Sequence, residues 1–347
     1  MCPTAAGPEV ACATVTVVAT TSSVRDEYLA FARGQAAGVS PTYEALARAV
    51  AADAHLVALL ADLPHGKQQP NLLFGVTRHL GGPVVEPGQF LGWVADTWAA
   101  VRAELMVRST QTNEAGRCAT LLPVLSGLPG PLALLEVGAS AGLCLYPDRY
   151  RYRYAPAASE GGATGTAVVG DGYGPVLECA WERDDPPPTH RPEVVWRGGL
   201  DLHPLDVTEP DDLHWLECLV WPEQHQRRER LRGAAAVVAS DPPVLVSGDL
   251  VDDLADLAAQ APKDATLVVF HTAVLGYVDT ARRREFAALV LTLPGHWVAN
   301  EHPSLLHGVV PGADLATRPP REGPEAFLTA LDGIPVGWAG PHGQFCA

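Results

Sequence analysis

The sequence predicts an α/β protein in which a doubly wound, mostly parallel sheet follows an N-terminal helical domain. Two observations support this prediction. Up to about residue 128 the apolar residues recur at helical spacing. From residue 131 onward, short apolar runs alternate with helix-length segments, which is the pattern of parallel strands covered on both faces.

The chain of 347 residues is long enough for one large domain with a helical addition, or for two domains. We expect residues 1–24 to form a flexible extension, because they lack the basic start of a signal peptide and are too broken for a membrane span. Residues 25–129 are predicted to form a helical lid or substrate domain, and residues 130–347 the sheet domain. Within it, the stretch at about 150–193 is rich in Gly, Pro and Ala, and it indicates an inserted hairpin or loop.

The expected helices of the first part begin and end at recognisable signals. Ser40 is placed to cap a helix whose first residue is Pro41, and the glycines of "NLLFGVTRHLGG" end another. The expected helical segments are 25–36, 40–63, 71–82, 91–109 and 115–128. A polar break, "TQTNEAG", separates the last two.

Five apolar runs are predicted to form the parallel strands. They are "LALLEVG" (132–138), "EVVWRGGLD" (193–201), "PVLVSGD" (243–249), "TLVVFHT" (266–272) and "HWVANE" (296–301). Ligands of open parallel sheets bind outside the carboxyl ends of the strands. The residues that follow each run are therefore the candidate site residues.

Charge and cysteine content restrict the class of protein. The formal net charge of -16 repels nucleic-acid phosphates and anionic lipids, so we expect a small-molecule substrate and neither a nucleic-acid nor a membrane partner. The basic run "RRER" (227–230) is interpreted as a solvated helix face. Seven cysteines without a CxxC pair argue against a disulfide framework or a zinc cluster and favour the cytoplasm.

The first predicted strand ends in an E-x-G-x-S-x-G pattern. Its members are Glu136, Gly138, Ser140 and Gly142. Small residues there let a ligand approach the backbone, and a following helix would present free N–H groups. A tight strand-to-helix turn that binds nothing gives the same pattern.

Acidic residues also end the second and third predicted strands. Asp201 is placed to accept both hydroxyls of a ribose, and Asp249, after Gly248, to accept from an adenine amino group. Each acid alone also suits a helix cap. Three acids in register favour a cationic nucleoside over a pyrophosphate, and the ligand that fits is S-adenosyl-L-methionine.

Together these stretches resemble known families. The order "LLEVGASAGL", "GLDLHP", "VSGD" and "LVVFHTAVLGYV" is similar to the Rossmann-like core of class I S-adenosylmethionine-dependent methyltransferases over about residues 130–300. With "GKQQPNLL", "QTNEAGRC" and "LVWPEQ", nearly the whole chain resembles the actinobacterial DUF2332 family, which has no assigned function. Ser140 stands where the methyltransferase pattern has its middle glycine.

The fourth and fifth strand ends supply the expected reactive side. His271 would face the sulfonium of the cofactor and orient a substrate or remove its proton, with Tyr277 one or two turns later. Asn300 and Glu301 would reach the same rim, Glu301 as a substrate contact. A core histidine bonded to backbone is the alternative.

The polar break upstream is the expected lid. Gln111, Asn113 and Arg117 are predicted substrate contacts, and Glu114 a catalytic group, because amides and charges between apolar helices belong to a ligand contact or an interior network. The stretch "GKQQPN" (66–71) is a second lid candidate.

Methyl transfer to a small molecule is thus the expected reaction. The alternative within the fold is a transferase or cyclase that uses the aminocarboxypropyl arm. An alternative with a different fold is a serine hydrolase that uses Ser140, because Gly138, Ser140 and Gly142 also fit the G-x-S-x-G elbow of such enzymes. A ligand-binding protein without turnover is a further alternative. No metal motif is present, and the sequence predicts no oligomeric state.

Overall fold

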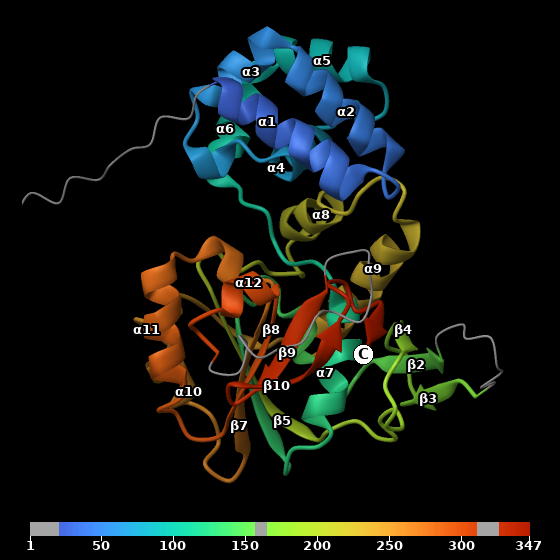
Figure 1. Cartoon of the computed structure of the whole chain (residues 1–347), viewed down its shortest axis with the longest axis vertical. Coiled ribbons are helices and arrows are strands. Elements are labelled where there is room, and N and C mark those ends of the chain that lie inside the picture. Colours follow the sequence, from blue (N-terminus) through green and yellow to red (C-terminus); the bar gives the residue numbers. More distant parts are fainter. Residues whose placement is uncertain (1–20, 157–164, 311–325) are drawn as a thin grey trace, which may run out of the picture. The chain divides into compact units, whose positions relative to one another are not determined.

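The computed structural model describes residues 21–156, 165–310 and 326–347, which form two compact units (Figure 1). The helical unit holds the described residues up to Thr110 together with Trp221–Glu223, and the sheet unit holds the rest. The expected boundary at residue 129 thus moves to Thr110, because the segment after it packs into the core of the sheet unit. Most of the expected extension, residues 1–20, lies outside the described residues.

The helical unit confirms the first four expected helical segments, with two added breaks. Its helices are α1 (Thr21–Phe31), α2 (Pro41–Ala52), α3 (Ala54–Ala61), α4 (Pro70–His79), α5 (Pro87–Asp96) and α6 (Trp98–Val107). Ser40 caps α2, since its Oγ accepts from the N–H of Tyr43 at 3.1 Å. Asp53 splits the 40–63 segment because its side chain caps α3, accepting from the N–H of Leu56 at 2.8 Å.

The sheet unit contains a mostly parallel sheet of 11 strands within the described residues. The strands are β1 (Leu132–Val137), β2 (Arg151–Pro156), β3 (Ala167–Val169), β4 (Val176–Trp181), β5 (Val194–Asp201), β6 (Val244–Ser247), β7 (Thr266–Thr272), β8 (His296–Glu301), β9 (Phe327–Leu331), β10 (Ile334–Ala339) and β11 (Phe345–Cys346). Their spatial order is β3-β2-β4-β11-β10-β9-β8-β7-β1-β5-β6. All five predicted strands are confirmed, as β1, β5, β6, β7 and β8.

The order of the parallel strands reverses at β1. This strand pairs with β5 on one side and β7 on the other, while β6 continues beyond β5 and β8 beyond β7. Numbered along the chain, the five strands therefore lie in the order third, second, first, fourth, fifth. The carboxyl ends of these strands meet at one edge of the sheet, where doubly wound proteins bind their ligands.

The inserted segment at about 150–193 belongs to the same sheet instead of forming a separate excursion. Strand β2 pairs in parallel with β4 and in antiparallel with β3, and β4 pairs in parallel with β11, the last strand of the chain. The short strand β11 thus connects β2, β3 and β4 to β10, with which it pairs in antiparallel. Residues 157–164 of the insertion lie outside the described part.

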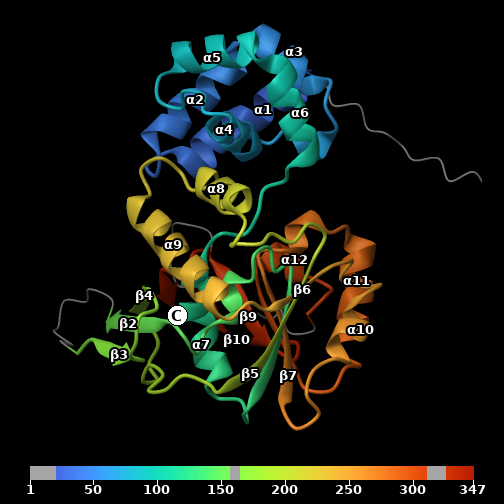
Figure 2. The same cartoon turned by 180° about the vertical axis from the view of Figure 1, so that it is seen from behind.

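Helices cover both faces of the parallel strands (Figures 1 and 2). Those of this unit are α7 (Cys118–Leu125), α8 (Pro210–Cys218), α9 (His225–Ser240), α10 (Leu254–Ala258), α11 (Thr280–Val290) and α12 (Pro303–Leu306). Residues of α7 and α9 share one buried apolar cluster with Leu134 and Phe270, which we call the α7 face. Residues of α10 and α11 share a second cluster with Leu135 and Val269, the α11 face. Successive strand residues alternate between these two faces.

Two simple properties accompany this fold. None of the helices in the described part is long and apolar enough to cross a membrane. The described cysteines, Cys118, Cys144, Cys179, Cys218 and Cys346, are all buried and free of disulfides.

Candidate functional site

The turn after β1 occupies the point where the strand order reverses. Gly138, Ser140 and Gly142 have φ angles of 72°, 51° and 71°, in the left-handed region. The backbone N–H of Gly138 donates to the carbonyl oxygen of Leu200 at 2.7 Å, so the turn is fixed to the end of β5. The expected helix after this turn is absent: a single 3-10 turn, Leu143–Leu145, follows, because the chain goes on to β2 at the far side of the sheet.

Protein atoms fill the space beside the two glycines of this turn. A Cβ on Gly138 would lie 2.3 Å from the Cγ2 of Val274, and one on Gly142 would lie 3.0 Å from the Cγ of Pro243. These glycines therefore serve the close packing of the turn against the chain. Val274 and Pro243 already occupy the side of the turn on which a Cβ of either glycine would lie, so a ligand has to contact the turn from a different side.

Asp201 connects the ends of β1 and β5. Its Oδ2 accepts from the N–H of Ser140 and its Oδ1 from the N–H of His203, both at 2.8 Å. Asp201 is not a helix cap, since α8 begins only at Pro210. An ionised carboxylate has about four acceptor positions, so two remain for a ligand.

Asp249, at the end of β6, is held by neighbours. Its Oδ1 accepts from the N–H of Val251 at 2.8 Å and forms an ion pair with Arg282. Burial alone would raise the pKa of Asp249, but the N–H groups of Val251 and Asp252 and the charge of Arg282 together lower it. An adenine amino group would have to share this carboxylate with Arg282.

His271 and Glu301 form a fully buried pair on the α11 face. Both side chains are 0% exposed, and Nδ1 of His271 lies 2.8 Å from Oε1 of Glu301. The same oxygen accepts from the N–H groups of Val274 and Leu275, at 2.7 and 3.2 Å. The expected base and substrate contact thus belong to an interior hydrogen-bond network that fixes the turn after β7.

The register places Asn300 on the opposite face from His271 and Glu301. Thr272 of β7 pairs with Asn300 of β8, so their side chains lie on the same face of the sheet. Glu136 of β1 pairs with Phe270, which is two residues before Thr272 and therefore on the same face as Thr272. The side chains of Glu136, Thr272 and Asn300 thus share the α7 face. Nδ2 of Asn300 donates to Oγ1 of Thr120 at 3.2 Å. The predicted single rim therefore divides into two faces, because adjacent residues of a strand point in opposite directions.

Several buried polar atoms at this edge lack a hydrogen-bond partner within the described residues. They are Oε2 of Glu136, Oγ of Ser140, Oγ1 of Thr272 and Oδ1 of Asn300. Buried polar atoms in native proteins usually have a partner, so atoms of this kind are candidates for a bound ligand or ordered water.

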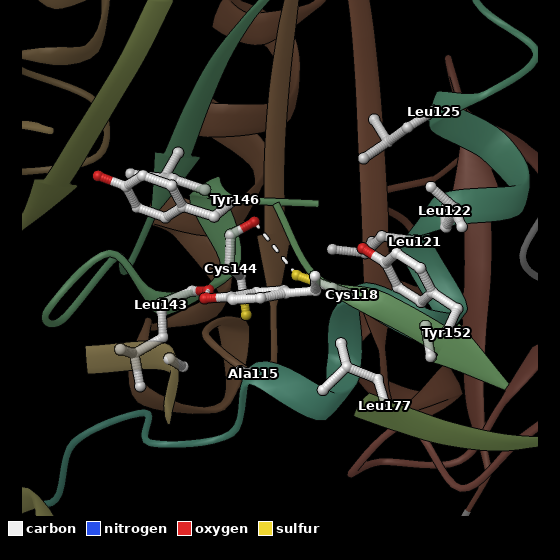
Figure 3. Packing of buried hydrophobic residues seen from close by; sticks show 14 of the residues in the cluster. Ala115, Cys118, Leu121, Leu122, Leu125, Leu143, Cys144, Tyr146, Tyr152 and Leu177 are labelled. Carbon is white, nitrogen blue, oxygen red and sulfur yellow. Dashed lines mark hydrogen bonds between the residues drawn. The ribbon is translucent and has the colours of Figure 1, made fainter. Parts of the chain in front are cut away.

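Glu136 is the most perturbed acid of this edge. Burial, and then the neighbouring Cys144, raise its pKa well above the usual value, while Arg117 opposes the shift. Glu136 is 1% exposed, so its protonated form is favoured and can donate as well as accept. Figure 3 shows the interior nearby, where Sγ of Cys118 donates to the carbonyl oxygen of Cys144 at 3.4 Å.

The polar break before α7 is an interior network of the sheet unit. Arg117 donates from Nη1 to the carbonyl oxygen of Thr272 and from Nε to that of Pro341, both at 2.9 Å. Nε2 of Gln111 donates to the carbonyl oxygen of His203 at 3.1 Å. Gln111 and Arg117 thus contact the chain just beyond β5 and the end of β7 respectively.

Two arginines of α9 complete this network. Glu114 is 1% exposed and pairs with Arg227 at 3.0 Å and with Arg230 at 3.1 Å, so it is a structural anion. Asn113 accepts from Nη2 of Arg227 at 2.6 Å and donates to the carbonyl oxygen of Leu216 at 3.1 Å. The interpretation of 227–230 as a solvated face was wrong for these two residues, which lie three apart on one side of α9.

Three further predicted features lie away from this network. Tyr277 is 72% exposed and lies in the 3-10 turn Leu275–Tyr277. Lys67, in the second lid candidate, donates to the carbonyl oxygen of Arg108 at 2.6 Å within the helical unit. Ser140 is 1% exposed and its Oγ contacts no base in the described part of the chain, whereas a hydrolase nucleophile requires one.

A cavity of about 360 Å³ adjoins the turn after β1. Its walls come from Ala141, from the loop after β5 with Leu205 and Asp206, from Val238 at the end of α9 and from Leu245 of β6. This size lies within the range of small-molecule sites, and the lining is partly apolar.

The sequence matches one known family over most of its length. Residues 25–82 and 86–338 match a family described as "Uncharacterized protein conserved in bacteria (DUF2332)". Neither the curated proteins nor the solved structures contain a match to the chain.

Proposed function

The chain therefore belongs to the DUF2332 family, and we propose that it is an enzyme that binds S-adenosylmethionine at the carboxyl ends of β1, β5 and β6. The observation that carries the proposal is the reversal of strand order at β1, with Glu136, Asp201 and Asp249 at or beside the ends of the three strands on one side of the reversal. A nucleoside placed across this edge meets hydroxyl acceptors and no surplus of cations.

The absence of a helix after β1 bears on the kind of nucleoside. A dinucleotide places its pyrophosphate on the N-terminus of the helix that follows the first strand. Here only the 3-10 turn Leu143–Leu145 follows. S-adenosylmethionine has no phosphate, so it needs neither that helix N-terminus nor a cationic partner. It therefore fits this edge better than a dinucleotide does, even though Glu136 is favoured in its protonated form and Asp249 is paired with Arg282.

The residues at this edge fit parts of the cofactor. Asp201 keeps two acceptor positions for the ribose hydroxyls, and the 360 Å³ cavity beside Ala141 and Leu245 offers apolar contact for the base. The partnerless atoms of Thr272 and Asn300, with Arg117 beside them, suit the polar amino-acid end. Asp249 can take part only while it remains paired with Arg282.

The cofactor supplies an electrophilic carbon on sulfur, and methyl transfer to a small molecule is the reaction we propose. Displacement at this carbon needs alignment more than acid or base assistance, so holding the reactants contributes much of the rate. His271 is assigned as a positioning residue, because its pair with Glu301 fixes the turn at Val274 and Leu275. Use of the aminocarboxypropyl arm, by transfer or cyclisation, requires the same binding residues.

Calorimetric titration with S-adenosylmethionine and S-adenosylhomocysteine tests the proposal. We expect Asp201→Ala to weaken binding by about 2 to 3 kcal/mol, or roughly 30- to 150-fold, because two ribose hydroxyls lose a charged acceptor. Asp256→Ala is the matched control: this aspartate is exposed on α10 of the same unit and does not line the 360 Å³ cavity. No binding of either nucleoside by the parent protein, or equal losses in the two variants, would refute the assignment.

A further inference from the structure

A second cavity, of about 500 Å³, lies in the sheet unit among residues that the proposed nucleoside site does not use. It is lined by Arg153 of β2, Glu178 of β4, Arg230 of α9, the backbone at Gly116, and His342 and Gln344 of the C-terminal turn. Figure 2 shows β2, β4, α9 and the C-terminus in this part of the unit.

Positive charge exceeds negative charge around this cavity. Arg227 and Arg230 share the single carboxylate of Glu114, at 3.0 and 3.1 Å. The hydrogen bonds of Arg117 go to the carbonyl oxygens of Thr272 and Pro341, which carry no charge. At the rim, Arg153 pairs with Glu178 at 2.6 Å, and both side chains are more than half exposed.

Among the described residues, Glu114 and Glu178 are the carboxylates that contact these guanidinium groups, so the positive charge of the four arginines is only partly compensated by direct pairing. Taking a charge out of water costs free energy unless a counter-charge and hydrogen bonds offset the loss. A bound anion would supply the missing negative charge.

His342 provides a neutral partner inside the same cavity. Its Nδ1 is buried and has no hydrogen-bond partner among the described residues. Burial, and then the charges of Arg227, Arg117 and Arg230, lower the pKa of His342 well below its usual value, so the ring is uncharged at neutral pH. A neutral imidazole offers a donor or an acceptor according to its tautomer.

The wall that carries His342 is rigidly packed. A Cβ on Gly343 would lie 1.9 Å from the carbonyl oxygen of Gly116, and one on Gly116 would lie 2.6 Å from that of His342. The side-chain oxygen of Gln344 accepts from the N–H of His342 at 2.8 Å. The backbone that carries the ring is thus fixed before any ligand arrives, which lowers the entropic cost of binding.

We propose that this cavity binds the carboxylate or phosphate group of a small molecule, with Arg230 and Arg153 as charged donors and His342 as a neutral partner. Guanidinium groups match both oxyanions through paired N–H donors. Glu178 is exposed and repels the ligand, so Arg153 has to turn from Glu178 toward the anion. The residues that line this cavity differ from those of the proposed nucleoside site, and of the charged groups named here only Arg117 is used in both arguments.

Titration with inorganic phosphate and with succinate, each at constant ionic strength set with chloride, tests this site in the whole protein. We expect saturable binding of at least one anion, and the stronger of the two identifies the ligand group. Arg230→Met and Arg153→Gln should each weaken this binding tenfold or more. Arg153 is half exposed, so its substitution leaves the fold intact even if loss of Arg230 disturbs Glu114.

Arg232→Met is the matched control. Arg232 lies on the same helix and also pairs with a glutamate, Glu217, but it does not line the cavity. Its substitution should leave anion affinity within twofold of the parent. Failure of both anions to bind beyond the chloride background, or an equal loss in Arg232→Met, would overturn the proposal.

Discussion

Replacement of Glu301 by alanine tests the buried pair on the α11 face. Oε1 of Glu301 accepts three hydrogen bonds, from the ring of His271 and from the N–H groups of Val274 and Leu275. Glu301 is 0% exposed, so water cannot replace the lost acceptor. Leaving one buried donor without an acceptor costs about 1 to 3 kcal/mol, so three such donors cost about 3 to 9 kcal/mol. Because the surrounding chain can relax in part, we expect a loss of about 4 to 6 kcal/mol in the free energy of unfolding.

Glu301→Gln separates this hydrogen-bond role from a catalytic one. Glutamine keeps an oxygen that can accept the same bonds, although as a neutral acceptor, and we expect a loss of only about 1 to 3 kcal/mol. Glu285→Ala is the control, because Glu285 is 54% exposed and its pair with Arg282 on α11 contributes at most about 0.5 kcal/mol.

Urea unfolding of the three variants, followed by circular dichroism, measures these differences. If Glu301→Ala unfolds within 1 kcal/mol of the parent, the pair does not stabilise the fold. If the Glu301→Ala protein is as stable as the parent but inactive, His271 and Glu301 take part in the reaction, as the sequence suggested.

Two more predictions concern the chain around the two proposed sites. Gly343→Ala should destabilise the protein by about 3 kcal/mol or more, since the new Cβ meets the carbonyl oxygen of Gly116 at a φ of +81°. A Cβ on Gly308, at a φ of +67°, would make only an ordinary contact with Nη2 of Arg284 at 3.9 Å, so Gly308→Ala should cost only about 1 to 2 kcal/mol in thermal or urea unfolding. Burial raises the pKa of Glu136, so its stabilising contribution is complete below the usual pKa of a glutamate and is lost as pH rises through the raised pKa. Glu136→Gln should accordingly equal the parent in stability near pH 4 and exceed it increasingly at higher pH, and an advantage that shrinks as pH rises would contradict the assigned direction.

The parallel strands and the first turn were predictable from local sequence. Apolar runs such as "LALLEV" and "TLVVFH" form strands whose two faces are both covered by the protein. Such strands require apolar residues such as Leu and Val at nearly every position, so they can be recognised without knowing which strands lie beside them. The small residues of the turn after β1 were also readable, because a left-handed φ at Gly138 and Gly142 strongly favours glycine. The helix expected after this turn was not formed, since the next segment continues toward β2.

The sequence by itself determined the mixed α/β class, the five parallel strands and the acidic strand ends. Only the tertiary structure decided which way the side chains point: the register sets His271 with Glu301 on one face and Asn300 on the other. It also paired Arg227 and Arg230 with the buried Glu114, and brought β11 beside β4. The physical reason is that these contacts join residues far apart in the chain, whereas hydrophobic periodicity and turn preferences report only on neighbours.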